Sequence, residues 1–87
     1  MLFVALSEWK AKDVPKVIEA RSKQVIPPEL KVISEVTLFG QHRGIMIFDS
    51  PDEKTLFKSL VPYLQVMTLK VMPALTIDDS VKLATGK

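Results

Sequence analysis

The 87-residue chain contains no cysteine, and this absence removes several kinds of chemistry at once. Disulfides, thiolate nucleophiles and cysteine-ligated zinc or iron–sulfur sites are all excluded. His42 is the only histidine, and it stands in a turn between Gly40 and Gly44. A solvated turn residue is the simpler interpretation of His42, and catalysis is the alternative. The sequence also has no HExxH, Walker A or GxGxxG motif, so we expect neither a metal nor another cofactor.

Long uncharged runs are missing as well. No apolar stretch approaches the ~20 residues of a membrane span. Residues 1–9 lack the basic start and the small-residue cleavage site of a signal peptide. Twelve basic and ten acidic residues leave a net charge of +2, which is too small to indicate nucleic-acid binding by charge. We expect a cytoplasmic protein that binds neither a membrane nor a nucleic acid.

The chain is short and apolar for its length. Residues 1–87 are enough for one domain near the lower end of the size range that buries a useful core. Apolar residues make up 47% of the chain, and the mean hydropathy is +0.19. This composition favours burial of part of the surface in an oligomer, and a monomer with a well-filled core is the alternative.

Apolar periodicity and turn residues predict six main elements. The two glycines of segment 40–44 favour a hairpin between the second and third strands. Pro73 indicates that the last strand lies at a sheet edge, because proline cannot donate a ladder hydrogen bond. The predicted strands are residues 2–9, 30–39, 45–49 and 67–74, and the predicted helices are residues 14–24 and a segment from Pro51 to about Pro62.

Capping residues define where the helices begin. Asp13 is placed to cap the first helix. Ser50 at the N-cap, Pro51 at the first helical position and Glu53 at the third form a predicted capping box for the second helix. Thr76 is placed to cap a last short turn. The stripe expected to be buried on the second helix comprises Leu56, Phe57, Leu60, Val61 and Leu64.

The order βαββαβ predicts an α+β, ferredoxin-like fold. Right-handed crossovers and short loops give an antiparallel sheet of strand order 4-1-3-2 with both helices on one face. In residues 30–39, strict alternation sets one group of side chains (Val32, Ser34, Val36, Leu38) against the other (Lys31, Ile33, Glu35, Thr37, Phe39). Because the strands are apolar on both faces, we expect a second copy to cover the open face, which gives a homodimeric α/β-barrel.

An RNA-recognition domain shares this element order and has to be weighed. Arg43 and Gly44 open the third strand as the basic-glycine pair of that domain would. However, Ile45 and Ile47 occupy the positions where two base-stacking aromatic rings are expected. The sequence therefore argues against RNA binding.

A cluster of aromatic and polar residues is the candidate ligand site. The end of the first strand, the hairpin and the end of the second helix converge at one edge of this fold. An aromatic cluster with a cation and a titratable ring suits a small apolar or anionic ligand. The alternative is that Trp9 and Tyr63 only complete the core. The candidate residues are Trp9, Phe39, His42, Arg43 and Tyr63.

Glu35 and Lys70 are candidates for the interface between subunits. Both interrupt otherwise apolar strands, and buried charges need partners. The two predicted strands lie at opposite edges of the sheet. We expect Glu35 of one copy to meet Lys70 of the other if the strands pair or pack between subunits.

Several segments together resemble a known group of proteins. They are residues 30–35 (LKVISE), 40–44 (GQHRG), 50–52 (SPD) and 69–74 (LKVMPA). In this pattern the chain resembles a small uncharacterised family, a domain of unknown function, in the dimeric α/β-barrel group that is related to GYD-domain proteins. The wider group includes cofactor-free monooxygenases, muconolactone isomerases, haem-degrading enzymes and ligand-sensing domains. The chain has no asparagine and one tryptophan, which departs from the monooxygenases, and His42 lies in a hairpin where haem-binding members use a helix histidine.

Two functions remain open after this comparison. The first is a homodimeric module that binds a small metabolite or mediates an interaction. The second is a cofactor-independent enzyme, an oxygenase or isomerase, acting on a small apolar or aromatic substrate. In the second, His42 or Arg43 polarises the substrate, and Trp9 and Tyr63 line the pocket. A connected pocket with at least two polar groups near Trp9 favours the enzyme, and a filled interior favours the module.

Overall fold

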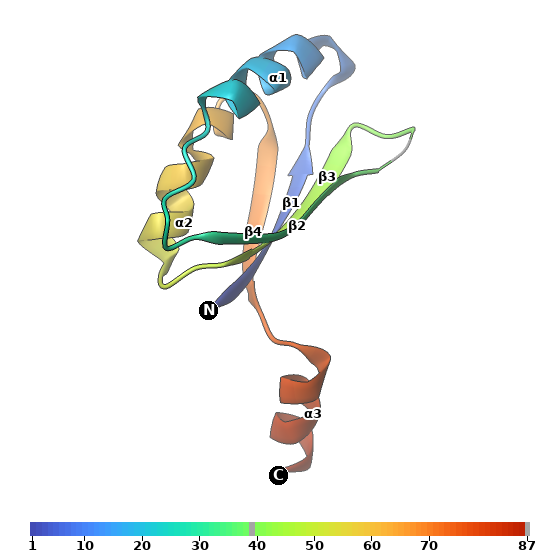
Figure 1. Ribbon diagram of the computed structural model, residues 1–87. Helices are drawn as coiled ribbons and strands as arrows, with labels where there is room; N and C mark the ends of the chain where they lie inside the picture. Colours follow the sequence, from blue (N-terminus) through green and yellow to red (C-terminus); the bar gives the residue numbers. More distant parts are fainter. Residues whose placement is uncertain (39, 87) are drawn as a thin grey trace.

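The computed structural model describes residues 1–38 and 40–86, so the candidate site residue Phe39 lies outside the described residues. The described part has the predicted element order, with a third helix after the last strand (Figure 1). Short 3-10 turns precede α1 and follow α2. The elements are β1 (Leu2–Glu8), η1 (Ala11–Asp13), α1 (Val14–Lys23), β2 (Lys31–Thr37), β3 (Arg43–Asp49), α2 (Glu53–Leu60), η2 (Val61–Tyr63), β4 (Thr68–Ala74) and α3 (Ile77–Thr85).

The sheet has the predicted ferredoxin-like topology. Its four strands run antiparallel in the order β2-β3-β1-β4, which is the expected 4-1-3-2 arrangement. β1 lies at the centre, where Phe3 pairs with Phe48 on one side and with Pro73 on the other. Pro73 therefore belongs to an edge strand, as predicted from its missing N–H.

Helices α1 and α2 cover one face of the sheet (Figure 1). Phe3 and Ala5 of β1 and Met46 and Phe48 of β3 are buried on this face, where they pair as neighbours across the two strands. Their apolar side chains form one contiguous cluster with residues of the helices and connections. The rest of this core is Ala20, Leu30, Leu56, Leu60 and Tyr63.

The opposite face of the sheet, which we call the open face, is apolar in its centre. Its side chains alternate along each strand with the buried ones, so the pairing places them together. Each is half-buried or exposed in a single chain. The apolar residues of the open face are Leu2, Val4, Leu6, Val36, Ile45, Ile47, Met72 and Ala74.

A β-bulge in β2 corrects the predicted alternation. The register shifts between Val32 and Ser34, so Val32 lies opposite Phe48 while Ser34 lies opposite Ile47. Strict alternation put Val32 and Ser34 on the same face, and this prediction is wrong. The extra residue, Ile33, moves Val32 to the helix-covered face and leaves Ser34 on the open face.

The observed caps differ in part from the predicted ones. α2 begins two residues later than expected, because the Asp52 carboxylate, not Ser50, accepts a hydrogen bond from the Thr55 N–H at 2.7 Å. Ser50 is instead buried, and its hydroxyl donates to the Asp52 carbonyl at 2.7 Å. Asp13 occupies the N-cap position of α1 as predicted, but its side chain makes no cap hydrogen bond. Thr76 caps α3 as predicted, accepting from the Asp79 N–H at 3.1 Å.

The helix α3 extends away from the rest of the molecule (Figure 1). It is a nine-residue helix, longer than the short turn that the sequence indicated, and none of the side chains in Ile77–Thr85 is buried. The stripe predicted on α2 is also only partly covered. Leu56 and Leu60 are buried, whereas Phe57, Val61 and Leu64 are exposed.

Candidate functional site

A cleft of about 300 Å³ lies between α1 and the helix-covered face of β2 and β3. Val14, Val17 and Ile18 of α1 form one wall. Apolar side chains dominate its lining, with a few polar groups among them, which is the usual composition of a small-molecule site. The remaining lining residues are Ser7, Trp9, Arg21, Glu35, Val36, Thr37, Gly44, Met46, Tyr63 and Met67.

Trp9 and His42 lie next to each other at one end of this cleft. Trp9 follows β1, and its backbone N–H donates to the backbone carbonyl of His42 at 3.0 Å. The two rings contact edge to face, with centroids 6.5 Å apart and planes at 61°. Trp9 is half-buried and His42 is exposed, so the imidazole lies outside the cleft lining.

Tyr63 lines the same cleft from η2 and belongs to the core as well. Its ring is 3% exposed, and its hydroxyl donates to Gln24 Oε1 at 3.0 Å. This bond connects the end of α2 to the end of α1. Tyr63 therefore both completes the core and borders the cleft, so the two interpretations of this residue are not exclusive.

Arg43 lies on the other face of the sheet. It pairs in register with Glu8, and its Nη2 is 3.6 Å from Glu8 Oε1. Gly44, its neighbour, faces the cleft instead. The structure thus brings together Trp9, His42 and Tyr63 of the predicted cluster but not Arg43, and Phe39 lies outside the described residues.

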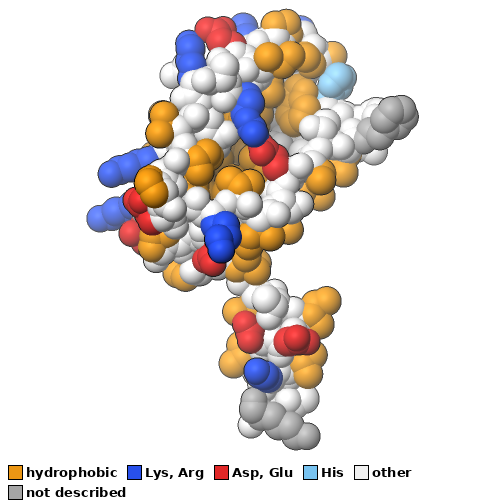
Figure 2. All heavy atoms as spheres, in the orientation of Figure 1, with side chains coloured by type: hydrophobic (Ala, Val, Ile, Leu, Met, Phe, Trp, Pro, Cys, Tyr) orange, Lys and Arg blue, Asp and Glu red, His pale blue; other side chains and the backbone are white. Residues whose placement is uncertain are grey.

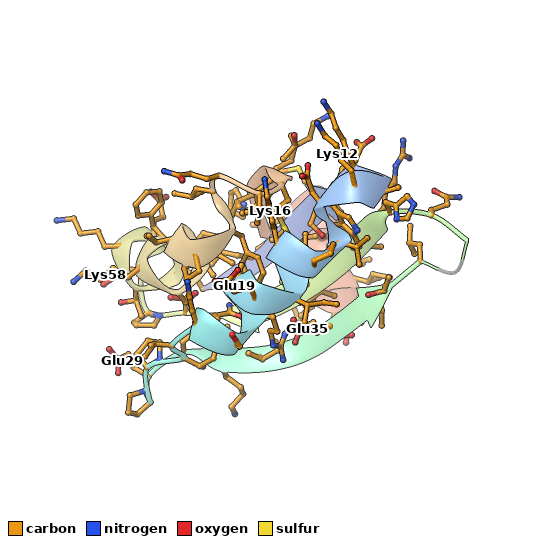
Figure 3. All side chains as sticks on the ribbon, turned by 90° about the horizontal axis from the view of Figure 1, so that it is seen from above. Lys12, Lys16, Glu19, Glu29, Glu35 and Lys58 are labelled. Carbon is orange, nitrogen blue, oxygen red and sulfur yellow. The ribbon has the colours of Figure 1, made fainter. Side chains whose placement is uncertain are left out.

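The charged pair of the cleft is Arg21 and Glu35. Glu35 points from β2 toward α1 (Figure 3), where its carboxylate forms an ion pair with the Arg21 guanidinium. Glu35 and Lys70 do lie on the two edge strands, as predicted. They nevertheless lie on opposite faces, because Glu35 is opposite Met46 and Lys70 is opposite Leu6. Glu35 thus has a partner within its own chain.

Three polar residues of the cleft were not predicted as part of a site: Ser7, Arg21 and Thr37. Ser7 is buried beneath the cleft, in register with Gly44. Arg21 was identifiable from its place on the apolar side of α1, at helical spacing from Val14, Val17 and Ile18. The bulge at Ile33 leaves Thr37 and Glu35 on the face that contacts α1.

Gly44 is required where β3 passes the floor of the cleft. A Cβ built on it would lie 2.8 Å from Ser7 Oγ and 3.2 Å from the Val36 carbonyl oxygen. Both distances are shorter than ordinary van der Waals contact. The absence of a side chain at Gly44 therefore leaves room for Ser7 and for the ring of Trp9, which would be 3.6 Å away.

The comparison with protein families identifies the chain. A family model described as a domain of unknown function, DUF3303, matches residues 1–87. The chain belongs to the DUF3303 family. A search of the curated proteins finds no match to this DUF3303 chain.

Two kinds of site find no support in the described part of the DUF3303 domain. Residues 1–38 and 40–86 contain no group of three or more aspartate, glutamate or histidine residues close enough to hold a metal ion. Within the same residues, no helix has the length and apolarity needed to cross a membrane.

Proposed function

We propose that this protein is a homodimer whose chains each bind a small apolar or aromatic ligand in the cleft beside Trp9. The observation that carries the proposal is the cleft itself. Val14, Val17 and Met46 provide apolar walls, and Trp9 provides a ring against which a flat ligand can stack. Arg21 and Glu35 neutralise each other, so a ligand with a neutral polar group such as a phenol suits the site better than an anion.

The open face supports the homodimer. Leu6, Ile45 and Ile47 lie at its centre, and an apolar patch of this kind is typical of a protein interface. Two copies packed face to face would bury it, as in the dimeric α/β-barrel group to which we assign the family, with GYD-domain proteins as relatives. Lys70 lies on this face and Glu35 does not. A face-to-face dimer would therefore involve Lys70 but not Glu35.

A cofactor-independent enzyme is the second candidate, and the polar groups of the cleft favour it. Ser7, Thr37 and the Arg21–Glu35 pair lie within the same cleft as Trp9. A substrate hydroxyl or carbonyl held there would contact hydrogen-bonding groups in an otherwise apolar site. The His42 ring contacts Trp9 edge to face, whereas Arg43 lies on the other face of the sheet, in register with Glu8.

Tryptophan fluorescence tests the binding site directly, because Trp9 is the only tryptophan in the chain. Native mass spectrometry of the purified protein first determines the oligomeric state and any retained ligand. Titration with 4-nitrophenol at mildly acidic pH, where its hydroxyl is protonated and its nitroaromatic ring quenches tryptophan, should then give saturable quenching. A Val17→Phe variant, which fills the cleft from α1, should abolish saturation.

A matched control separates the cleft from the general surface. Val25 is 73% exposed in the connection after α1 and lies outside the cleft lining, so Val25→Phe should bind as the unsubstituted chain does. Equal, non-saturable quenching in all three proteins, together with no retained ligand in the mass spectrum, would refute the binding proposal. Turnover of a bound aromatic compound, abolished in His42→Ala, would favour the enzyme over the module.

A further inference from the structure

We propose that α3 of one chain docks in the apolar groove between α2 and β4 of a second copy. This inference concerns a surface remote from the cleft, and it does not depend on a ligand. It is also separate from the contact between open faces, since the groove lies on the helix-covered side of the sheet. Four observations support it: the state of α3, the shape of the groove, the match between them and the direction in which α3 leaves its own domain.

One side of the helix α3 is apolar and exposed to solvent. Ile77 is 82% exposed and Leu83 is 72% exposed, and both belong to an arc that also contains Val81 and Ala84. The charged residues Asp78, Asp79 and Lys82 lie outside this arc, with Asp79 at its edge beside Leu83. In Figure 2, apolar side chains are exposed at both edges of this helix with charged side chains between them. A nine-residue helix is too short to be stable alone in water, so its apolar side needs a partner.

The groove between α2 and β4 is an apolar recess with a volume of about 730 Å³. Its floor contains the buried residues Phe3, Leu56 and Leu60. Exposed apolar side chains line its walls, including Phe57 of α2 and Val71 of β4. The helices α1 and α2 thus cover only part of the helix-covered face, and the part over the edge strand β4 is left open.

Length and charge match between the helix and the groove. α3 has nine residues and α2 has eight, so they are about 13 and 12 Å long and can lie side by side. Lys54, Lys58 and Glu53 are the charged residues that line the groove, which leaves it with an excess of one positive charge, and Lys58 extends outward from α2 (Figure 3). The first turn of α3 carries Asp78 and Asp79. Docking of the apolar side would leave Asp79, at the edge of that side, nearest to the two lysines.

The connection between β4 and α3 directs the helix to another molecule. Ala74 is still paired with Leu2 in the sheet. Thr76 is extended, with φ −63° and ψ 158°, and caps α3 through its hydroxyl, while its carbonyl accepts from the Ser80 N–H at 3.0 Å. The helix therefore continues in the direction of β4 and points away from the groove of its own chain, which lies back along that strand (Figure 1). A second copy is the occupant that fits.

Disulfide trapping between two singly substituted full-length chains tests the docking, because the natural chain has no cysteine. Val81→Cys protein is mixed with Phe57→Cys protein under mild oxidation. A docked helix holds the two thiols at a local concentration far above that of the bulk protein, so the mixed disulfide should exceed that of a control mixture by about tenfold or more. The control mixture pairs Val81→Cys with Val25→Cys, a position that is more exposed than Phe57 and lies outside the groove.

Two further sets of variants complete the experiment: charge reversals in the two cysteine variants, and a single chain that carries both cysteines. Lys54→Glu and Lys58→Glu in the Phe57→Cys chain should lower the trapped fraction several-fold, and Asp78→Lys with Asp79→Lys in the Val81→Cys chain should restore it. Equal trapping in the test and control mixtures would overturn the inference. An intrachain disulfide in a single chain carrying both cysteines, without mixed dimers, would also overturn it, because α3 would then occupy its own groove. If the natural chain is dimeric but the cysteine variants show no trapping above the control mixture, the docking is overturned and the open-face dimer is left standing.

Discussion

At the residue scale, Gly44 controls the shape of the cleft. β3 passes so close to Ser7 and Val36 that a side chain at this position has no room. The same close approach leaves the space into which Trp9 projects. The absence of a Cβ at Gly44 therefore connects the packing of the sheet to the shape of the cleft.

Replacing Gly44 by alanine should both lower the unfolding free energy of the protein and narrow the cleft. The new Cβ would contact Ser7 Oγ and the Val36 carbonyl, and overpacking of this kind costs about 1–3 kcal/mol of unfolding free energy. Urea denaturation measures the loss. Adding Ser7→Ala should recover part of it, since the closest clashing atom is removed. Full stability in Gly44→Ala alone would contradict this account of the cleft floor.

Some residues of the cleft could be predicted from the sequence and others could not. Trp9 and Tyr63 were identified because the ends of the first strand and the second helix meet at one edge of this topology. The pairing of Arg21 with Glu35 was not, because the face on which Glu35 lies depends on the bulge at Ile33. A bulge is set by pairing between strands, and no local pattern in the segment indicated it.

At the scale of elements, hydrophobic periodicity and proline positions were sufficient for the order of strands and helices. The start of α2 was misplaced by two residues, since both Ser50 and Asp52 are good capping residues and the burial of Ser50 decides between them. The Asp52 carboxylate accepts a hydrogen bond from the backbone N–H of Thr55, and this bond lowers the pKa of Asp52 below its ordinary value.

This lowered pKa makes the stability of the protein depend on pH. The ionised Asp52 contributes its full stabilisation above the pKa that aspartate has in the unfolded chain, about 3.9, and the contribution is lost as the pH falls through the lower folded value. Asp52→Asn keeps a capping oxygen without the charge. The melting temperature of the natural chain minus that of Asp52→Asn should therefore be constant above about pH 5 and should fall at more acidic pH. A difference that does not change between pH 2 and pH 7 would contradict the assignment of Asp52 as the cap.

At the scale of the whole molecule, apolar surface remains uncovered at three places in the described part of a single chain. They are the open face of the sheet, the exposed apolar side of α3 and the groove between α2 and β4. The high apolar content of the sequence predicted that such surfaces would exist. The helix α3 was underestimated as a short turn, because its capping threonine was recognised but its apolar side had no visible partner in the predicted domain.

The central claim is that this chain forms a dimer through the open face. Size-exclusion chromatography with light scattering at micromolar concentration should give twice the chain mass of 9.8 kDa. Ile47→Lys places a charge in the middle of that face, which should cost about 3 kcal/mol or more and weaken dimerisation by about a hundredfold. Val25→Lys, on the exposed connection after α1, should leave the mass unchanged. A mass of 9.8 kDa for the natural chain, or equal dimerisation of the natural and Ile47→Lys proteins with both folded by circular dichroism, would contradict the claim.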